Sequence, residues 1–190
     1  MNIGILSGSF NPIHQGHLMI ANFIAEFSPL DEIWFVVSPQ NPLKSPTSLA
    51  DQSLRLQMVK LALEGYEKLN ASDFEFHQPI PSYTIDTLKA LEMAYPEHRF
   101  SLVIGADNWA VFEKWRHYEQ IIQNYHIYIY NRLGYPVSIP ESFRSQVETL
   151  DSPVVEISST FVRQSIKDGK NIQAFLPEKV WKYIKENQLY

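Results

Sequence analysis

The chain has 190 residues, of which 45% are hydrophobic and 19% are charged, and this composition is typical of a globular protein and argues against a disordered one. Its 16 Lys and Arg residues against 21 Asp and Glu residues give a net charge of -5, which predicts neither nucleic acid nor an anionic membrane as a partner. The sequence has no cysteine, which excludes disulfides, thiolate metal sites and cysteine nucleophiles.

No charged leader precedes the first apolar run, and nowhere do 18 apolar residues follow one another. We therefore expect a cytoplasmic protein without a membrane partner.

The first twenty residues follow the order strand, turn, loop, helix. An apolar run at 3–6 predicts a buried strand, and the small residues at 7–9 predict a tight turn after it. Two histidines, His14 and His17, follow a proline-containing loop. Apolar residues then recur at helical spacing and predict a helix over about 14–26. This order is typical of a nucleotide site.

The rest of the chain alternates strand patterns with helix patterns. Short β-branched and aromatic runs predict strands at 32–37, 74–76, 100–104, 125–130 and 154–157. Apolar spacing predicts helices at 51–62 and 85–95 and a less regular helix at 108–123. It also predicts a helix that begins at 158 and a terminal helix with Pro177 in its first turn. The segments 38–48 and 131–152 are predicted loops. The alternation predicts a Rossmann-like, doubly wound α/β fold with a mostly parallel sheet, helices on both faces and one domain over 1–190.

His14 and His17 stand at positions i and i+3 of the predicted first helix, on one face near its positive end. A phosphate there would meet free backbone N–H groups and two imidazoles that can donate to a phosphoryl oxygen. An isolated His-x-x-His is more often one packed or capping histidine and one solvated histidine. A structural metal is a further option, but no cysteine or second histidine cluster supports it.

Residues 8–18, GSFNPIHQGHL, resemble the signature of the nucleotidyltransferase superfamily, whose motif is [His/Thr]-x-Gly-His. Within that superfamily the stretch is most similar to the bacterial nicotinate-nucleotide adenylyltransferases. The superfamily also contains pantetheine-phosphate adenylyltransferases and cytidylyltransferases. The first motif therefore indicates the superfamily and leaves the substrate open.

Residues 157–163, ISSTFVR, are similar to a second motif of the family, which begins Ile-Ser-Ser-[Ser/Thr] and ends in arginine. Hydroxyls and free N–H groups at a helix start bind phosphate oxygens. Arg163 follows Ser159 by one helical turn, so its guanidinium can reach the same anion. On its own, a Ser-Ser-Thr sequence is better interpreted as a helix cap beside a solvated arginine. Because the first motif is also present, we favour phosphate binding here.

Three elements resemble the family's acceptor side. Residues 82–87 match its Tyr-Thr-x-Asp-Thr element beside the pyridine-nucleotide pocket, although they also make an ordinary helix start. Residues 104–108 match its Gly-[Ala/Gly]-Asp element, whose carboxylate can bind a ribose. Trp115 matches a tryptophan that stacks on the nicotinate ring. The next residue, often tyrosine in the family, is Arg116 here.

Two cations resemble further family positions. Lys44 matches the lysine of a Pro-Pro-His-Lys segment, with leucine in place of the histidine, and would clamp a phosphate. Arg132 stands where the family has Arg-Pro-Gly. For any one lysine in a polar loop, a solvated side chain is the commoner role.

The resemblance implies transfer of the adenylyl group of ATP to nicotinate mononucleotide, giving deamido-NAD and pyrophosphate in NAD biosynthesis. It implies catalytic roles for His14, His17 and Arg163, with Mg²⁺ arriving on ATP and no metal site of the protein's own. The ATP-binding residues that it implies are Gly8, Ser9, Phe10, His14, His17, Gly105, Asp107, Ile157, Ser158, Ser159, Thr160 and Arg163. The acceptor-binding residues that it implies are Ser9, Lys44, Tyr83, Thr84, Asp107, Trp115 and Arg132.

Two alternatives stay open from the sequence. One is a sister adenylyltransferase that uses nicotinamide mononucleotide or phosphopantetheine as acceptor. The other is a non-catalytic nucleotide sensor of the same fold.

Overall fold

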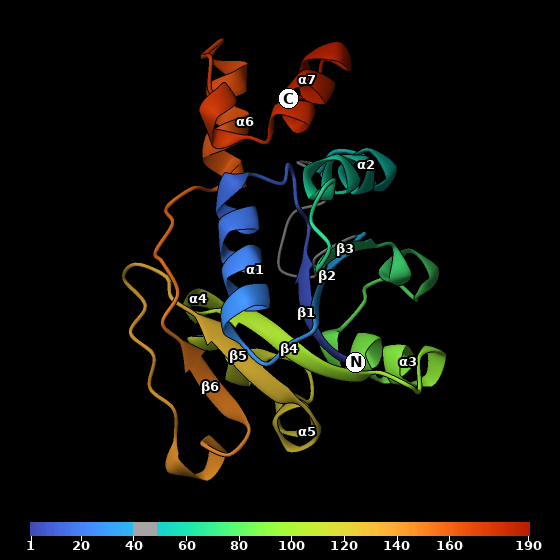
Figure 1. Cartoon of the computed structure of the whole chain (residues 1–190), viewed down its shortest axis with the longest axis vertical. Helices are drawn as coiled ribbons and strands as arrows, with labels where there is room; N and C mark the ends of the chain where they lie inside the picture. Colours follow the sequence, from blue (N-terminus) through green and yellow to red (C-terminus); the bar gives the residue numbers. More distant parts are fainter. Residues whose placement is uncertain (40–48) are drawn as a thin grey trace.

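The computed structural model describes residues 1–39 and 49–190, and within them six parallel strands form one sheet (Figure 1). The strand order is β3-β2-β1-β4-β5-β6, which puts β1 and β4 at the centre. The strands are β1 (Asn2–Gly8), β2 (Glu32–Val37), β3 (Leu69–Ser72), β4 (Arg99–Gly105), β5 (His126–Tyr130) and β6 (Val147–Leu150). This is the doubly wound α/β fold that the sequence predicted.

The central strands are apolar along most of their length because both faces of the sheet are covered. Ile5 of β1 lies opposite Trp34 of β2 and Leu102 of β4. Ile5 and Leu102 are each 1% exposed, and Trp34 packs at the border of the core. Parallel strands covered on both faces carry near-continuous apolar runs. Such runs explain why these strands were visible in the sequence.

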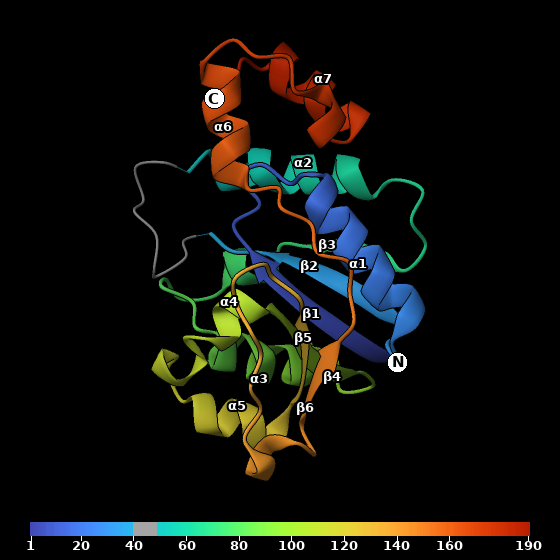
Figure 2. The same cartoon turned by 90° about the vertical axis from the view of Figure 1, so that its left-hand side faces the viewer.

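Helices lie on both faces of the sheet (Figure 1). One apolar cluster joins the sheet to α1 (Gln15–Phe27), α2 (Gln52–Leu63), α6 (Ser159–Lys167) and α7 (Glu178–Glu186). A second cluster joins it to α3 (Thr84–Ala94), α4 (Ala106–Trp109) and α5 (Tyr118–Asn124). In both views α6 and α7 lie at the same end of the molecule as α2 (Figures 1 and 2). No helix in the described part of the chain has the length and apolar character needed to cross a membrane.

The predicted strand at 74–76 is wrong. The edge strand β3 is the preceding run, and residues Phe74–His77 form a 3₁₀ turn. The aromatic run does not pair with the outer edge of β3 within the described residues, because Phe76 and Phe74 pack against different apolar clusters. It turns instead, and its Glu75 is buried.

The end of the predicted sheet is also corrected. The segment 131–152 was predicted as a loop, but it contains β6, which pairs with β5. The strand predicted at 154–157 does not form, and the chain from 151 to 158 has no helix or strand. The missed strand has a plain physical cause. As an edge strand, β6 keeps two exposed polar residues between two buried apolar ones, so no apolar run marks it.

Two helical predictions need smaller corrections. The irregular helix at 108–123 is divided into α4, a 3₁₀ turn at Phe112–Lys114 and α5. Pro177 stands one residue before the first residue of α7, in the capping position. Its ring fixes a backbone angle that suits either place.

Candidate active site

A crevice forms where the sheet's two central strands end. The chain leaves β1 toward α1 and β2, and it leaves β4 toward α4 and β5, so the connections diverge at the carboxyl ends of β1 and β4. Ligands of open α/β sheets bind at such a point. Two cavities lie there, a first cavity of about 380 Å³ and a second cavity of about 590 Å³. Five residues line both: Ser9, His17, Asp107, Arg132 and Ser159.

The two histidines stand at the start of α1, and their rings stack with centroids 3.7 Å apart. The backbone N–H of His14 donates to Nδ1 of His17 at 3.2 Å. Because that nitrogen accepts a hydrogen bond, the neutral His17 ring carries its proton on Nε2. The ring of Phe10 packs edge-on against His17 and restrains it further. His17 is thus oriented to donate from Nε2.

The environment of His14 favours its neutral form. Its side chain is buried, and burial, with the positive charge of Arg132 after it, lowers the pKa of His14 from 6.5 to about 3. A Cβ on Gly16 would lie 3.1 Å from Nδ1 of His14, so glycine leaves the room that the stacked ring occupies. His14 lines the second cavity as a neutral imidazole.

The second motif begins α6 and is fastened to the loop that precedes α1. Ser158 caps the helix by accepting a first-turn backbone N–H at 3.1 Å. Oγ of Ser159 donates to the Pro12 carbonyl oxygen, and Nη1 of Arg163 donates to the Asn11 carbonyl oxygen, both at 2.9 Å. These bonds join segments about 150 residues apart in the sequence. They hold the start of α6, where the first N–H groups of a helix have no intrahelical acceptor, beside the second cavity.

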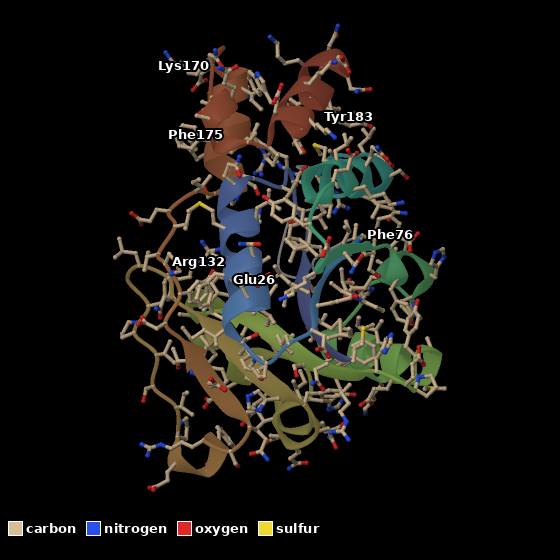
Figure 3. All side chains as sticks on the ribbon, in the orientation of Figure 1. Glu26, Phe76, Arg132, Lys170, Phe175 and Tyr183 are labelled. Carbon is tan, nitrogen blue, oxygen red and sulfur yellow. The ribbon has the colours of Figure 1, made fainter. Side chains whose placement is uncertain are left out.

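Asp107 and Arg132 stand where the two cavities meet, with Oδ1 and Nε 3.7 Å apart. Both atoms are buried, and neither makes a hydrogen bond within the described residues. The other nitrogens of Arg132 donate at 3.4 Å to the Val155 carbonyl oxygen and the Tyr130 hydroxyl. Figure 3 shows Arg132 beside α1, close to the end of β5. Buried polar atoms without partners are rare in proteins, so these two are suited to a polar ligand.

The first cavity has aromatic walls. Tyr83 and Thr84, at the start of α3, and Trp115 line this cavity and not the second. The ring of Phe112 packs against Trp115 with centroids 5.2 Å apart, which holds the indole in place. A flat ring that enters the first cavity would therefore meet a rigid aromatic surface.

Glu75 connects three parts of the first cavity. It is 3% exposed and accepts hydrogen bonds from the hydroxyls of Ser82 at 2.8 Å, Thr87 at 3.0 Å and Ser7 at 3.4 Å. These hydroxyls belong to the loop before α3, to α3 itself and to β1. One buried carboxylate therefore fixes the position of the segment that carries Tyr83.

Arg55 of α2 fixes the position of the turn after β1. Its side chain is 1% exposed, and among the described residues its guanidinium donates only to backbone carbonyl oxygens. The four acceptors are Ser9 at 2.6 Å, Ser38 at 2.8 Å, Ala50 at 2.9 Å and Pro39 at 3.0 Å. The turn at Ser9 is thereby tied to the end of β2 and to the residue just before the cap of α2.

Every described residue that the sequence predicted for the site lines one of the cavities. Besides the five shared residues, the first cavity is lined by Gly8, Phe10, Tyr83, Thr84, Gly105 and Trp115, and the second by His14, Ile157, Ser158, Thr160 and Arg163. Lys44 lies outside the described residues.

Sequence reasoning missed Glu75 and Arg55. Each had a local signal, because each is a charged residue within a buried apolar pattern. Arg55 shares a helical face with Met58, Val59 and Ala62, all buried, and Glu75 stands between two phenylalanines. A charge in such a place must be paired or hydrogen-bonded. The sequence does not show which groups it pairs with.

Among the described residues, no three His, Asp or Glu side chains come together to hold a metal ion.

Comparisons with known proteins agree with this geometry. The cytidylyltransferase-like family matches residues 5–165. A relative from Flavobacterium johnsoniae, named "Probable nicotinate-nucleotide adenylyltransferase", is 52% identical over 100% of this chain and 99% of its own length. A Bacteroides thetaiotaomicron relative of the same name is 51% identical over 98% of this chain and 92% of its own length.

A solved structure shares the fold. It is the nicotinic acid mononucleotide adenylyltransferase of Plasmodium falciparum in complex with NaAD, with a TM-score of 0.83, 24% identity and coverage of 100% of this chain and 97% of that one.

We expect Arg55→Met to lower the free energy of unfolding by about 3 kcal/mol or more, because buried carbonyl oxygens lose a charged donor. Urea denaturation measures the change. Arg55→Lys should recover part of the loss, since it keeps the charge without the planar group. Arg144→Met, at an exposed position, is the control. A loss below about 1 kcal/mol for Arg55→Met would contradict the role given to this side chain.

His14 should make the protein less stable as the pH falls. Its pKa in the folded state, about 3, lies below the ordinary histidine value of 6.5, so its contribution is complete above pH 6.5 and is lost toward pH 3. Within that window the free energy of unfolding should fall by up to about 1.4 kcal/mol per pH unit. His14→Gln should flatten this slope in urea denaturation at pH 7, 6 and 5, and His77→Gln, at an exposed position, should not. Equal slopes for wild type and His14→Gln would refute the pKa assignment.

Proposed function

This chain belongs to the cytidylyltransferase-like family and within it to the nicotinate-nucleotide adenylyltransferases, and we propose that it joins the adenylyl group of ATP to nicotinate mononucleotide. The products are deamido-NAD and pyrophosphate. The observation that carries the proposal is the meeting of two unlike cavities at His17. The first cavity suits a pyridine nucleotide, and the second suits a triphosphate.

ATP binding in the second cavity rests on donors from two helix starts. The first-turn N–H groups of α6, together with the guanidinium of Arg163, offer donors to anionic oxygens. His14 adds a neutral imidazole on the same side. We assign His14, Ser159 and Arg163 to the triphosphate. The narrow turn at Gly8, Ser9 and Phe10 lets the nucleotide approach the backbone closely.

Acceptor binding in the first cavity rests on stacking and hydrogen bonding. We assign the indole of Trp115 to stacking on the nicotinate ring, in a cavity that Tyr83 and Thr84 also line. Asp107 and Arg132, whose buried atoms lack hydrogen bonds within the described residues, are suited to ribose and phosphate groups. Lys44 keeps its expected role as a phosphate clamp.

The chemistry follows from placing both phosphates at the junction. A phosphate oxygen of the mononucleotide forms a bond to the α-phosphorus of ATP, and the bond from that phosphorus to the oxygen bridging to the β-phosphate breaks. The nucleophile is already ionised at neutral pH, so no general base is needed and catalysis consists of positioning and charge stabilisation. We assign His17, which donates from Nε2, to an oxygen of the α-phosphate.

Magnesium belongs to the proposal as the ion carried by ATP. When bound, it neutralises charge on the departing pyrophosphate. Binding through phosphate oxygens and water suits a site whose described residues offer no carboxylate cluster. We place the reaction in the cytoplasm, where both charged substrates are available.

The proposal is tested by release of pyrophosphate from ATP with three acceptors: nicotinate mononucleotide, nicotinamide mononucleotide and phosphopantetheine. We expect the highest kcat/KM with nicotinate mononucleotide. Faster release with phosphopantetheine would overturn the acceptor assignment. No release with any acceptor, from protein that binds ATP, would favour a nucleotide sensor.

His17→Ala should lower kcat about a hundredfold to a thousandfold with nicotinate mononucleotide and ATP, because the donor to the α-phosphate is lost. Tm should stay close to the wild-type value, since His17 is only partly buried. His77→Ala is the matched control, with a histidine removed from the surface outside both cavities. Near-normal kcat in His17→Ala would rule out the assignment.

A further inference from the structure

Arg116 is a charged residue of the first cavity to which no role has yet been given. It follows Trp115 directly and lines the first cavity, with its side chain 51% exposed. Two groups from the start of α3 hold it. Its guanidinium carbon lies 4.6 Å from the centroid of the Tyr83 ring, and Nη1 lies 3.8 Å from Oδ2 of Asp86. The side chain therefore bridges the two segments that carry the aromatic walls.

The hydrogen-bonding capacity of Arg116 is unused. A guanidinium has five N–H donors in a planar fork. The distance to Asp86 exceeds that of a hydrogen bond, and Arg116 makes no hydrogen bond to any residue of 1–39 or 49–190. The cation–π contact with the Tyr83 ring restrains the guanidinium without a hydrogen bond. Such a fork matches a planar carboxylate.

The two carboxylates among the described lining residues of the first cavity each face donors or a cation of the protein itself. Glu75 accepts three hydroxyls, and Asp107 faces Arg132 at the junction with the second cavity. Near Trp115, which lines only the first cavity, the remaining cations are Arg116 and Lys114 among the described lining residues. An anionic substituent on a ring that stacks on Trp115 would therefore meet positive charge, whereas a neutral amide would gain much less.

We propose that the Arg116 side chain binds the carboxylate of the acceptor's pyridine ring and is a specificity-determining residue for acid over amide. This inference rests on the proposed function and adds to it the residue that distinguishes two acceptors of nearly equal shape. A site built around a charged hydrogen bond discriminates strongly against a ligand that lacks the charge.

The test compares nicotinate mononucleotide with nicotinamide mononucleotide at saturating ATP. Arg116→Gln should lower kcat/KM for the acid about tenfold to a hundredfold, which is the loss of one charged hydrogen bond, and change kcat/KM for the amide less than about threefold. Arg116→Lys should give an intermediate ratio, since it keeps the charge and loses the fork. Arg144→Gln, which removes a charge outside both cavities, should leave the ratio unchanged.

Two further variants separate substrate binding from other roles. If Arg116 served only to pair with Asp86, Asp86→Asn would reproduce the effect of Arg116→Gln; we expect it to keep or raise the preference for the acid. If the general positive charge of the cavity were responsible, Lys114→Gln would lower the ratio equally; we expect a change below about threefold. The inference is overturned if Asp86→Asn or Lys114→Gln reproduces the effect of Arg116→Gln. It is also overturned if Arg116→Gln lowers kcat/KM equally for both acceptors or for neither.

Calorimetric binding of each mononucleotide to the protein without ATP separates this inference from the proposed function. Wild-type protein that binds the acid but releases no pyrophosphate would contradict the proposed reaction, and the Arg116→Gln affinities would still decide the inference. Wild-type protein that binds neither mononucleotide would overturn both. Wild-type protein that catalyses the reaction, with an unchanged acid-to-amide ratio in Arg116→Gln, would overturn the inference alone.

Discussion

The parallel pairing of β1 with β4 is the constraint on which the site depends. It brings the ends of two strands about 100 residues apart in the sequence to one point, and the diverging connections leave a crevice between them. At the end of β4, a Cβ on Gly105 would collide with Oδ1 of Asp107 and lie 3.1 Å from the Tyr130 ring. Glycine at that position lets the carboxylate turn back toward the crevice. Both cavities exist because these strand ends meet.

The loop between β1 and α1 is rigid because distant parts of the chain hold it. The carbonyl oxygen of Asn11 accepts a hydrogen bond from the guanidinium of Arg163. Its side-chain Oδ1 accepts hydrogen bonds from the Tyr190 hydroxyl at 2.7 Å and from the Ala50 N–H at 3.1 Å. Burial raises the pKa of the Tyr190 hydroxyl, which stays a donor at neutral pH. Together with Arg55, these donors fix the histidines before any substrate arrives. A preorganised site spends little energy on rearrangement during the reaction.

The two cavities differ in how their ionisable side chains are paired. In the second cavity His14 stacks on His17 with ring centroids 3.7 Å apart, and burial keeps the His14 ring neutral. In the first cavity Glu75 is surrounded by hydroxyl donors, so its charge is satisfied away from the acceptor. The groups left with unused hydrogen-bonding capacity, Arg116 at the wall and the Asp107–Arg132 pair at the junction, are the ones suited to ligands.

The sequence by itself determined the features that depend on neighbours along the chain. Apolar runs revealed β1, β2, β4 and β5, because a strand buried on both faces must be apolar, and the motifs at 8–18 and 157–163 marked the two helix starts. The tertiary structure alone decided the features that depend on partners far along the chain. Strand β6 has no apolar run and forms by pairing with the edge of β5, and Arg55 donates to carbonyl oxygens as far as 46 residues away. Local patterns record burial, but they do not record which distant group a buried charge or an edge strand will meet.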